Sequence, residues 1–184
     1  MLKKLMIVMA CVLLLGIAGQ FALAQDGTGL QGRSEVQLAA AWLRADAGDD
    51  ETEFTLLGAN YGTFVSPKWE LQGTLIYGKA SGAGGNSGNA WLIAPAALYH
   101  FVPETPASMI PYIGAGFAYA DVSDGDESND SLKLQYMAGV KFFIGGDYTT
   151  ASKAIFLEYR HTEVEFSGSA KVDMIWGGFS TFLK

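Results

Sequence analysis

Acidic and basic side chains alternate with apolar ones in several parts of this chain, and they are the first candidates for chemistry. Glu70 stands in "KWELQGTLIYGKA" between large apolar residues. If such charges point into a narrow interior they must pair, because an unpaired buried charge is costly. We therefore predict a network of paired charges with these members: Glu70, Lys133, Lys141, Glu158 and Arg160. The same interior side is expected to hold Glu35, Lys171 and Asp173.

Two histidines and one acidic run are the other candidates. His161 lies in "EYRHTEVEFSGS" ahead of Ser167 and Ser169, but a nucleophile needs a base within about 2.6–3.2 Å, and no such arrangement is evident. Both His161 and His100 are expected at the membrane interface, and no catalytic residue is predicted. The run "DVSDGDESND" offers oxygen ligands suited to Ca²⁺ or Mg²⁺, but Asn129 stands where an EF-hand loop needs glycine. A solvated loop is favoured, so no metal site and no cofactor are predicted.

The elements that position these residues are β-strands. From Trp69 to Tyr77, large apolar residues and glycine alternate with polar ones, and a period of two is typical of a strand with two unlike faces. The separators are rich in Gly, Pro, Ser and Asp, which favour turns. We predict an all-β chain with eight strands at 34–44, 53–65, 69–79, 89–101, 110–121, 131–144, 154–164 and 171–183.

An even number of strands places both termini at one end of a barrel. Membrane-spanning barrels have short periplasmic turns and longer external loops. The acidic connections "DAGDDE" and "SDGDESND" are therefore expected to be external loops. Pro95 has no N–H to donate to a sheet, and either a bulge or a shifted register would accommodate it.

The bulk of the apolar face decides which side meets water. The alternation places all four tryptophans on that face. Together with its other large side chains they are too bulky for the interior of an eight-stranded barrel. Trp69 and Tyr77 are eight residues apart, about 20 Å of height at a tilt of about 40°, close to the apolar band that aromatic girdles flank. The expected girdle contains Trp69, Tyr77, Trp91, Tyr99, Tyr119, Tyr159 and Trp176. A secreted soluble barrel with its apolar face inward is the competing fold.

The polar face would then line the lumen. The paired charges could form a selective polar path or a plug of salt bridges. The plug is favoured, since eight strands leave little room for a water channel.

The first residues are read as an export signal. "MLKK" is followed by a short apolar run and by Ala22-Leu23-Ala24, which predicts a cleaved signal peptide at 1–24 and a barrel domain at 25–184. The only cysteine, Cys11, lies in that segment, so the mature domain needs no disulfide. The net charge of −7 excludes the basic footprint of a nucleic-acid-binding protein.

Over residues 34–184 the chain resembles the small eight-stranded outer-membrane β-barrel proteins of Gram-negative bacteria, the OmpA-like families, most clearly in "ANYGTFVSPKWELQGTLIYG" and "PYIGAGFAYA". The resemblance implies a closed antiparallel transmembrane barrel of up-and-down topology in the outer membrane. Its implied partners are outer-membrane lipid and the barrel-insertion machinery, which reads a terminal aromatic; here Phe182 stands two residues before the end. The resemblance covers the barrel alone, so the anchoring role of longer relatives that carry a peptidoglycan-binding domain is not implied.

The favoured function is a structural or surface-interaction role without enzymatic activity. The alternatives are a small pore for solutes and a lipid-modifying enzyme. Some lipid A deacylases are barrels of this size and place a histidine and a serine close together on a late strand, but here Glu163 follows His161 at the second position.

Overall fold

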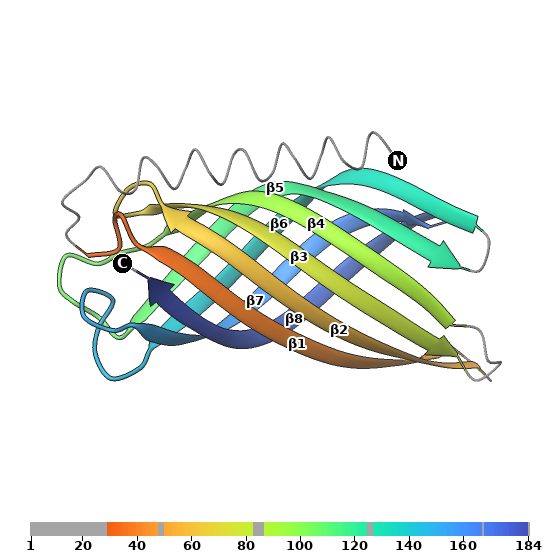
Figure 1. The fold of residues 1–184 in the computed structure, drawn as a ribbon, viewed down its shortest axis with the longest axis horizontal. Helices are drawn as coiled ribbons and strands as arrows, with labels where there is room; N and C mark the ends of the chain where they lie inside the picture. Colours follow the sequence, from red (N-terminus) through yellow and green to blue (C-terminus); the bar gives the residue numbers. More distant parts are fainter. Residues whose placement is uncertain (1–28, 48–49, 83–86, 125–126, 167, 184) are drawn as a thin grey trace.

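The chain folds into one closed barrel of eight antiparallel strands (Figure 1). The computed structural model describes residues 29–47, 50–82, 87–124, 127–166 and 168–183. Each strand pairs with the next in the chain, and the last returns to the first, which confirms the predicted all-β, up-and-down barrel. The strands are β1 (Ser34–Ala47), β2 (Asp50–Phe64), β3 (Trp69–Gly82), β4 (Ser87–His100), β5 (Met109–Asp124), β6 (Glu127–Phe143), β7 (Lys153–Phe166) and β8 (Gly168–Leu183).

The wall has an apolar outer face and a mixed inner face. In β3, Leu71 and Leu75 are 37% and 45% exposed. Gln72 and Thr74, which lie between these two leucines in the sequence, are each 2% exposed. An outer surface of this kind suits lipid, and a closed ladder pairs the backbone groups that lipid cannot satisfy. Among the described residues, no helix has the length and apolar character needed to cross a membrane. The predicted signal peptide, 1–24, lies outside the described residues.

Aromatic pairs mark two levels on the outside of β3 and β4. Trp69 packs edge-on against Tyr99, with ring centroids 5.2 Å apart, and Tyr77 lies 4.6 Å from Trp91 by the same measure. The hydroxyl of Tyr77 donates to Oδ1 of Asn89 at 3.0 Å. The two pairs are eight residues apart along each strand, as girdles at the two edges of an apolar band require.

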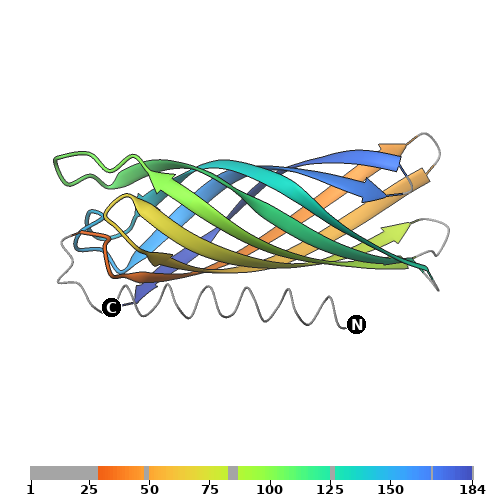
Figure 2. The same ribbon diagram turned by 90° about the horizontal axis from the view of Figure 1, so that it is seen from above.

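The connections differ from the expected lengths. At the end where β1 begins and β8 ends, which we call the terminal end, the strands are joined through 65–68, 101–108 and 144–152 (Figure 2). At the other end, the hairpin end, only 48–49, 83–86, 125–126 and 167 separate the strands, so the expectation of long external loops was wrong. The acidic segments continue the strands instead, because backbone pairing in a hairpin does not need apolar side chains.

Pro95 interrupts one ladder without shifting it. The β4–β5 pairing runs to Ile93 opposite Tyr119 and resumes at Ala96 opposite Gly116 in the same register. No extra residue has been inserted, so neither a bulge nor a shifted register is needed. Pro95 faces outward. Because proline has no N–H to donate, the ladder loses hydrogen bonding at this point and nowhere else.

Candidate functional site

The lumen holds a charged cluster near the terminal end, which we call the Lys141 cluster. Lys141, on β6, contacts Glu35 on β1 directly and Oε2 of Glu70 on β3 at 3.0 Å. His100, at the end of β4, lies with Nε2 2.8 Å from the same Glu70 oxygen. All four side chains are fully buried. Four strands are thus connected across the bore by ion pairs and hydrogen bonds.

Amide side chains extend this cluster along the lumen. Gln37 donates to Oε1 of Glu35 at 2.9 Å and accepts from Asn60 at 2.6 Å. Gln72 approaches the same Gln37 oxygen at 3.5 Å. Gln37 thus satisfies the Glu35 oxygen that Lys141 does not contact, as a buried charge requires, and Asn60 and Gln72 in turn hold Gln37.

Glycine on neighbouring strands makes room for the cluster. A Cβ at Gly62 would overlap the carboxylate of Glu70, and one at Gly139 would overlap the phenol of Tyr112. The small residues of the inner face therefore have a packing role, because large polar side chains fill the bore in front of them.

A second group of buried polar side chains, the Glu158 cluster, is centred on β7. Arg160 donates to Oε1 of Glu158 from Nε at 3.0 Å and from Nη2 at 2.7 Å, and Nε1 of Trp176 donates to the same oxygen at 2.8 Å. Tyr112 donates to Oε2 at 2.9 Å. The guanidinium of Arg160 also lies over the Trp176 ring, 4.9 Å from its centroid. One carboxylate thus accepts four donors and is balanced by one adjacent cation.

Apolar side chains form two further buried groups in the described lumen. One group packs around Trp176 and consists of Ala39, Ile76, Phe156 and Met174, with Leu56 and Leu92 against it. Another contains Ala96, Leu98, Tyr112 and Met137.

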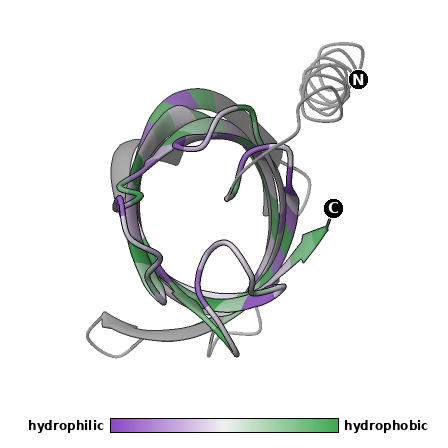
Figure 3. Ribbon diagram, turned by 90° about the vertical axis from the view of Figure 1, so that its left-hand side faces the viewer, coloured by the Kyte–Doolittle hydropathy of each residue, from purple (hydrophilic) through white to green (hydrophobic). Residues whose placement is uncertain are grey.

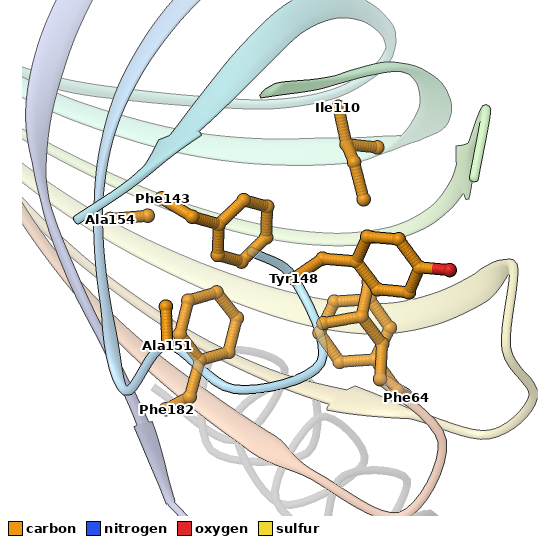
Figure 4. Close-up of a cluster of buried hydrophobic side chains, with 8 residues drawn as sticks. Phe64, Ile110, Phe143, Tyr148, Ala151, Ala154 and Phe182 are labelled. Carbon is orange, nitrogen blue, oxygen red and sulfur yellow. The ribbon is translucent and has the colours of Figure 1, made fainter. Parts of the chain in front are cut away.

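A third apolar group, the mouth cluster, lies at the mouth of the terminal end (Figure 4). Its aromatic members include Phe143 and Phe182, whose stacked rings lie 5.4 Å apart between centroids. Figure 3 looks into this mouth, where connecting segments bend inward across the ring of strands. The full set is Leu30, Phe64, Ile110, Phe143, Tyr148, Ala151, Ala154 and Phe182.

The structure divides the predicted charge network. Glu70 and Lys141 lie in one cluster, and Glu158 and Arg160 lie in the other. Lys133 is half-buried and lies opposite Ala118 in the β5–β6 ladder. This is an inward position, but it belongs to neither cluster. Glu35 joins Lys141, while the side chains of Lys171 and Asp173 are not among those described.

Three aromatic or imidazole residues were misplaced or missed. Trp176 was expected in the outer girdle but is 2% exposed and lies opposite Glu158, inside the lumen. In "VDMIWGGF" apolar residues fall on both faces of the strand, so alternation alone misassigned it. His100 was expected at the interface and is buried beside Glu70, and Tyr112 was not singled out.

The other residues predicted for the girdle face outward by register. Trp69, Trp91 and Tyr159 are 47%, 49% and 44% exposed, and Tyr77 and Tyr99 are partly exposed. Tyr119 lies opposite Ile93 on the outer side but is only 8% exposed.

His161 is not part of the lumen. Its ladder position is opposite Tyr136, which is 54% exposed, so the histidine belongs to the outer face and is partly buried there. Ser167 lies outside the described residues, as do the side chains of Ser169 and of the acidic run at 122–130. Among the positions that are described, no group of three or more His, Cys, Asp or Glu residues could hold a metal ion.

Comparison with known proteins places the chain. The family model described as "Outer membrane protein beta-barrel domain" matches residues 8–180, and no curated protein matches. Neisserial surface protein A (NspA) superimposes with a TM-score of 0.63 at 17% identity, covering 80% of this chain and 96% of that one.

Two further solved structures come from Pseudomonas aeruginosa. The outer membrane protein OprG gives a TM-score of 0.57 at 13% identity, with 85% of this chain and 96% of that chain covered. The N-terminal β-barrel domain of OprF gives 0.53 at 19% identity, with coverage of 82% and 96%. At these identities the likeness shows a shared fold alone. The family match spans nearly the whole chain, and the protein therefore belongs to the outer-membrane β-barrel family.

Proposed function

We propose that this outer-membrane barrel keeps its lumen closed and has a structural or surface-interaction role in a Gram-negative envelope, after export directed by residues 1–24. The observation that carries the proposal is the occupied bore: the mouth cluster, the Lys141 cluster, the Glu158 cluster and apolar side chains follow one another along it. Outer-membrane lipid and the barrel-insertion machinery are the proposed partners.

A solute path through the Lys141 cluster would separate a buried ammonium from two carboxylates. Both carboxylates are fully buried, and breaking such a pair on one side costs about 3–5 kcal/mol. Ion pairing of this kind favours a closed lumen over a permanently open one.

Conductance in a planar lipid bilayer tests the proposal. A heat-dependent gel shift first establishes that the barrel is folded. We expect the wild-type protein to be silent and the triple variant Glu35→Ala/Lys141→Ala/Phe182→Ala to conduct, because that variant removes side chains from two successive barriers. Discrete, reproducible openings of the folded wild-type barrel would contradict the closed lumen.

A small pore is the second candidate, and buried polar atoms favour it. Oε1 of Glu70, Nδ1 of His100 and Nη1 of Arg160 have no hydrogen-bond partner within the described protein, so water is their natural partner. A continuous water path would conduct, and Lys141→Gln would then change the ion selectivity. If the barrel conducts but Lys141→Gln leaves its reversal potential unchanged, the conducting path does not pass the Lys141 cluster.

The absence of enzymatic activity is part of the proposal. The buried carboxylates of the two clusters are engaged with cations and donors, which leaves them poorly placed to accept a proton from a substrate. The lipid profile of a deletion strain should match that of the parent. A profile altered equally by deletion and by His161→Ala would support a lipid-modifying enzyme instead.

A further inference from the structure

The connection between β6 and β7, residues 144–152, is more than a turn. It places Tyr148, 8% exposed, and Ala151, 4% exposed, among the aromatic rings of the mouth cluster (Figure 4). We call this segment the stopper loop. Loops normally run over the protein surface, so one that buries an aromatic side chain in the barrel mouth needs a reason.

A cation outside the strands fastens this loop. Arg33 directly precedes β1, and its Nη1 donates to the carbonyl of Tyr148 at 3.0 Å while Nη2 donates to the carbonyl of Ala151. Its guanidinium also lies over the ring of Phe182, 4.8 Å from the centroid. One side chain therefore links the segment before the first strand, the stopper loop and the last strand.

The stopper loop is held compact by hydrogen bonds of its own. Asp147 accepts hydrogen bonds from the backbone N–H groups of Thr149 at 2.8 Å and Thr150 at 3.1 Å, and its carbonyl accepts from Ala151 at 2.8 Å. Gly145, before this turn, is exposed and has a φ of 76°, a left-handed conformation that side chains disfavour. A compact turn beside a glycine can pivot without unwinding.

We propose that the stopper loop is a latched lid on the terminal mouth and that Arg33 is its latch. With the latch engaged, Tyr148 and Ala151 shield the inner residues of the mouth from water. Without it, the loop loses two charge-assisted hydrogen bonds and keeps those from Tyr148 to the carbonyls of Ala107 and Pro103, so the mouth opens more often while the barrel wall remains paired. The lid is a separate barrier from the Lys141 cluster, and it can be tested without measuring conductance.

Thiol labelling of the folded protein tests the latch. In a Cys11→Ser background the probe cysteine is the only thiol. Ala154, fully buried in the mouth cluster, becomes cysteine in one variant, and the exposed Ser152 becomes cysteine in a reference variant. A water-soluble maleimide is added to the barrel in detergent micelles after a gel shift shows that it is folded. We expect the Ala154→Cys probe to react at least 10-fold more slowly than the Ser152→Cys probe.

The latch variant is Arg33→Met, which keeps the aliphatic stem and removes the donors. Because Arg33 is partly exposed, its two hydrogen bonds are taken at the low value of about 1 kcal/mol each, which corresponds to roughly 30-fold in an opening equilibrium, so labelling of the Ala154→Cys probe should accelerate by about that factor. Lys68→Met removes an exposed cation at the same end and should leave the rate unchanged. If Arg33→Met does not fold, Arg33→Lys should give an intermediate rate, because an ammonium cannot reproduce the two-pronged contact.

Two results would overturn the latch. Equal rates for the two wild-type probes would show that the loop does not shield the mouth. Equal rates in the folded Arg33 variant and in Lys68→Met would show that Arg33 does not hold the lid. If the wild-type barrel does not conduct but its Ala154→Cys probe reacts as fast as the reference, the lid is refuted and the closed lumen stands. If the barrel conducts but that probe reacts slowly, the closed lumen is refuted and the lid stands.

Discussion

Replacing Lys141 by methionine removes the only ammonium that the structure places between Glu35 and Glu70. Both carboxylates are fully buried and would be left without their cation. Leaving such charges uncompensated costs about 3–5 kcal/mol, whereas replacing all charged members by neutral groups of similar volume is often close to neutral. We therefore expect Lys141→Met to lower the free energy of unfolding by about 3–5 kcal/mol, and Glu35→Gln/Glu70→Gln/Lys141→Met to recover most of it.

Urea unfolding in lipid vesicles, followed by tryptophan fluorescence, measures these differences. Lys153→Met is the control, because that lysine is exposed at the same end of the barrel. A loss below about 1 kcal/mol for Lys141→Met, or a triple variant no more stable than the single one, would refute the reasoning. The first result would mean that water already solvates the cluster, and the second that the side chains act through packing rather than charge.

Three further outcomes follow from local contacts. Trp176→Phe keeps an aromatic ring but removes the N–H donor to Glu158 together with part of the buried indole volume, so unfolding in urea should show a loss of at least about 2 kcal/mol, the value for a hydrogen bond to a charge; an unchanged midpoint would argue against the contact. Gly62→Ala should cost about 1–3 kcal/mol in the same assay through overlap with the Glu70 carboxylate, and Glu70→Gly should relieve it. The pKa of Asp147 is lowered by hydrogen bonds from Thr149, so its contribution to the turn is present above the ordinary aspartate pKa and is lost as pH falls below about 4. The labelling rate of the Ala154→Cys probe relative to the Ser152→Cys probe should rise there, a ratio that cancels the loss of thiolate at low pH, and Asp147→Asn should abolish that rise.

The sequence by itself determined the type of fold. Alternation is a local property of a strand, so the apolar and polar positions from Trp69 to Tyr77 predict the two faces correctly without any knowledge of the neighbours. The bulk of the outer set then favours a membrane barrel over a soluble one. The same local logic failed for Trp176, because both faces of β8 carry apolar residues at that point.

Only the tertiary structure decided which lumen residues meet. Lys141 and Glu35 are 106 positions apart in the chain, and their contact depends on how the strands are staggered when the barrel closes. No local pattern encodes that stagger. For the same reason His100 could be read as interfacial until closure placed it beside Glu70, and the stopper loop could be read as an ordinary turn. Its burial depends on Arg33 and on rings from distant strands, which meet only because the barrel is closed.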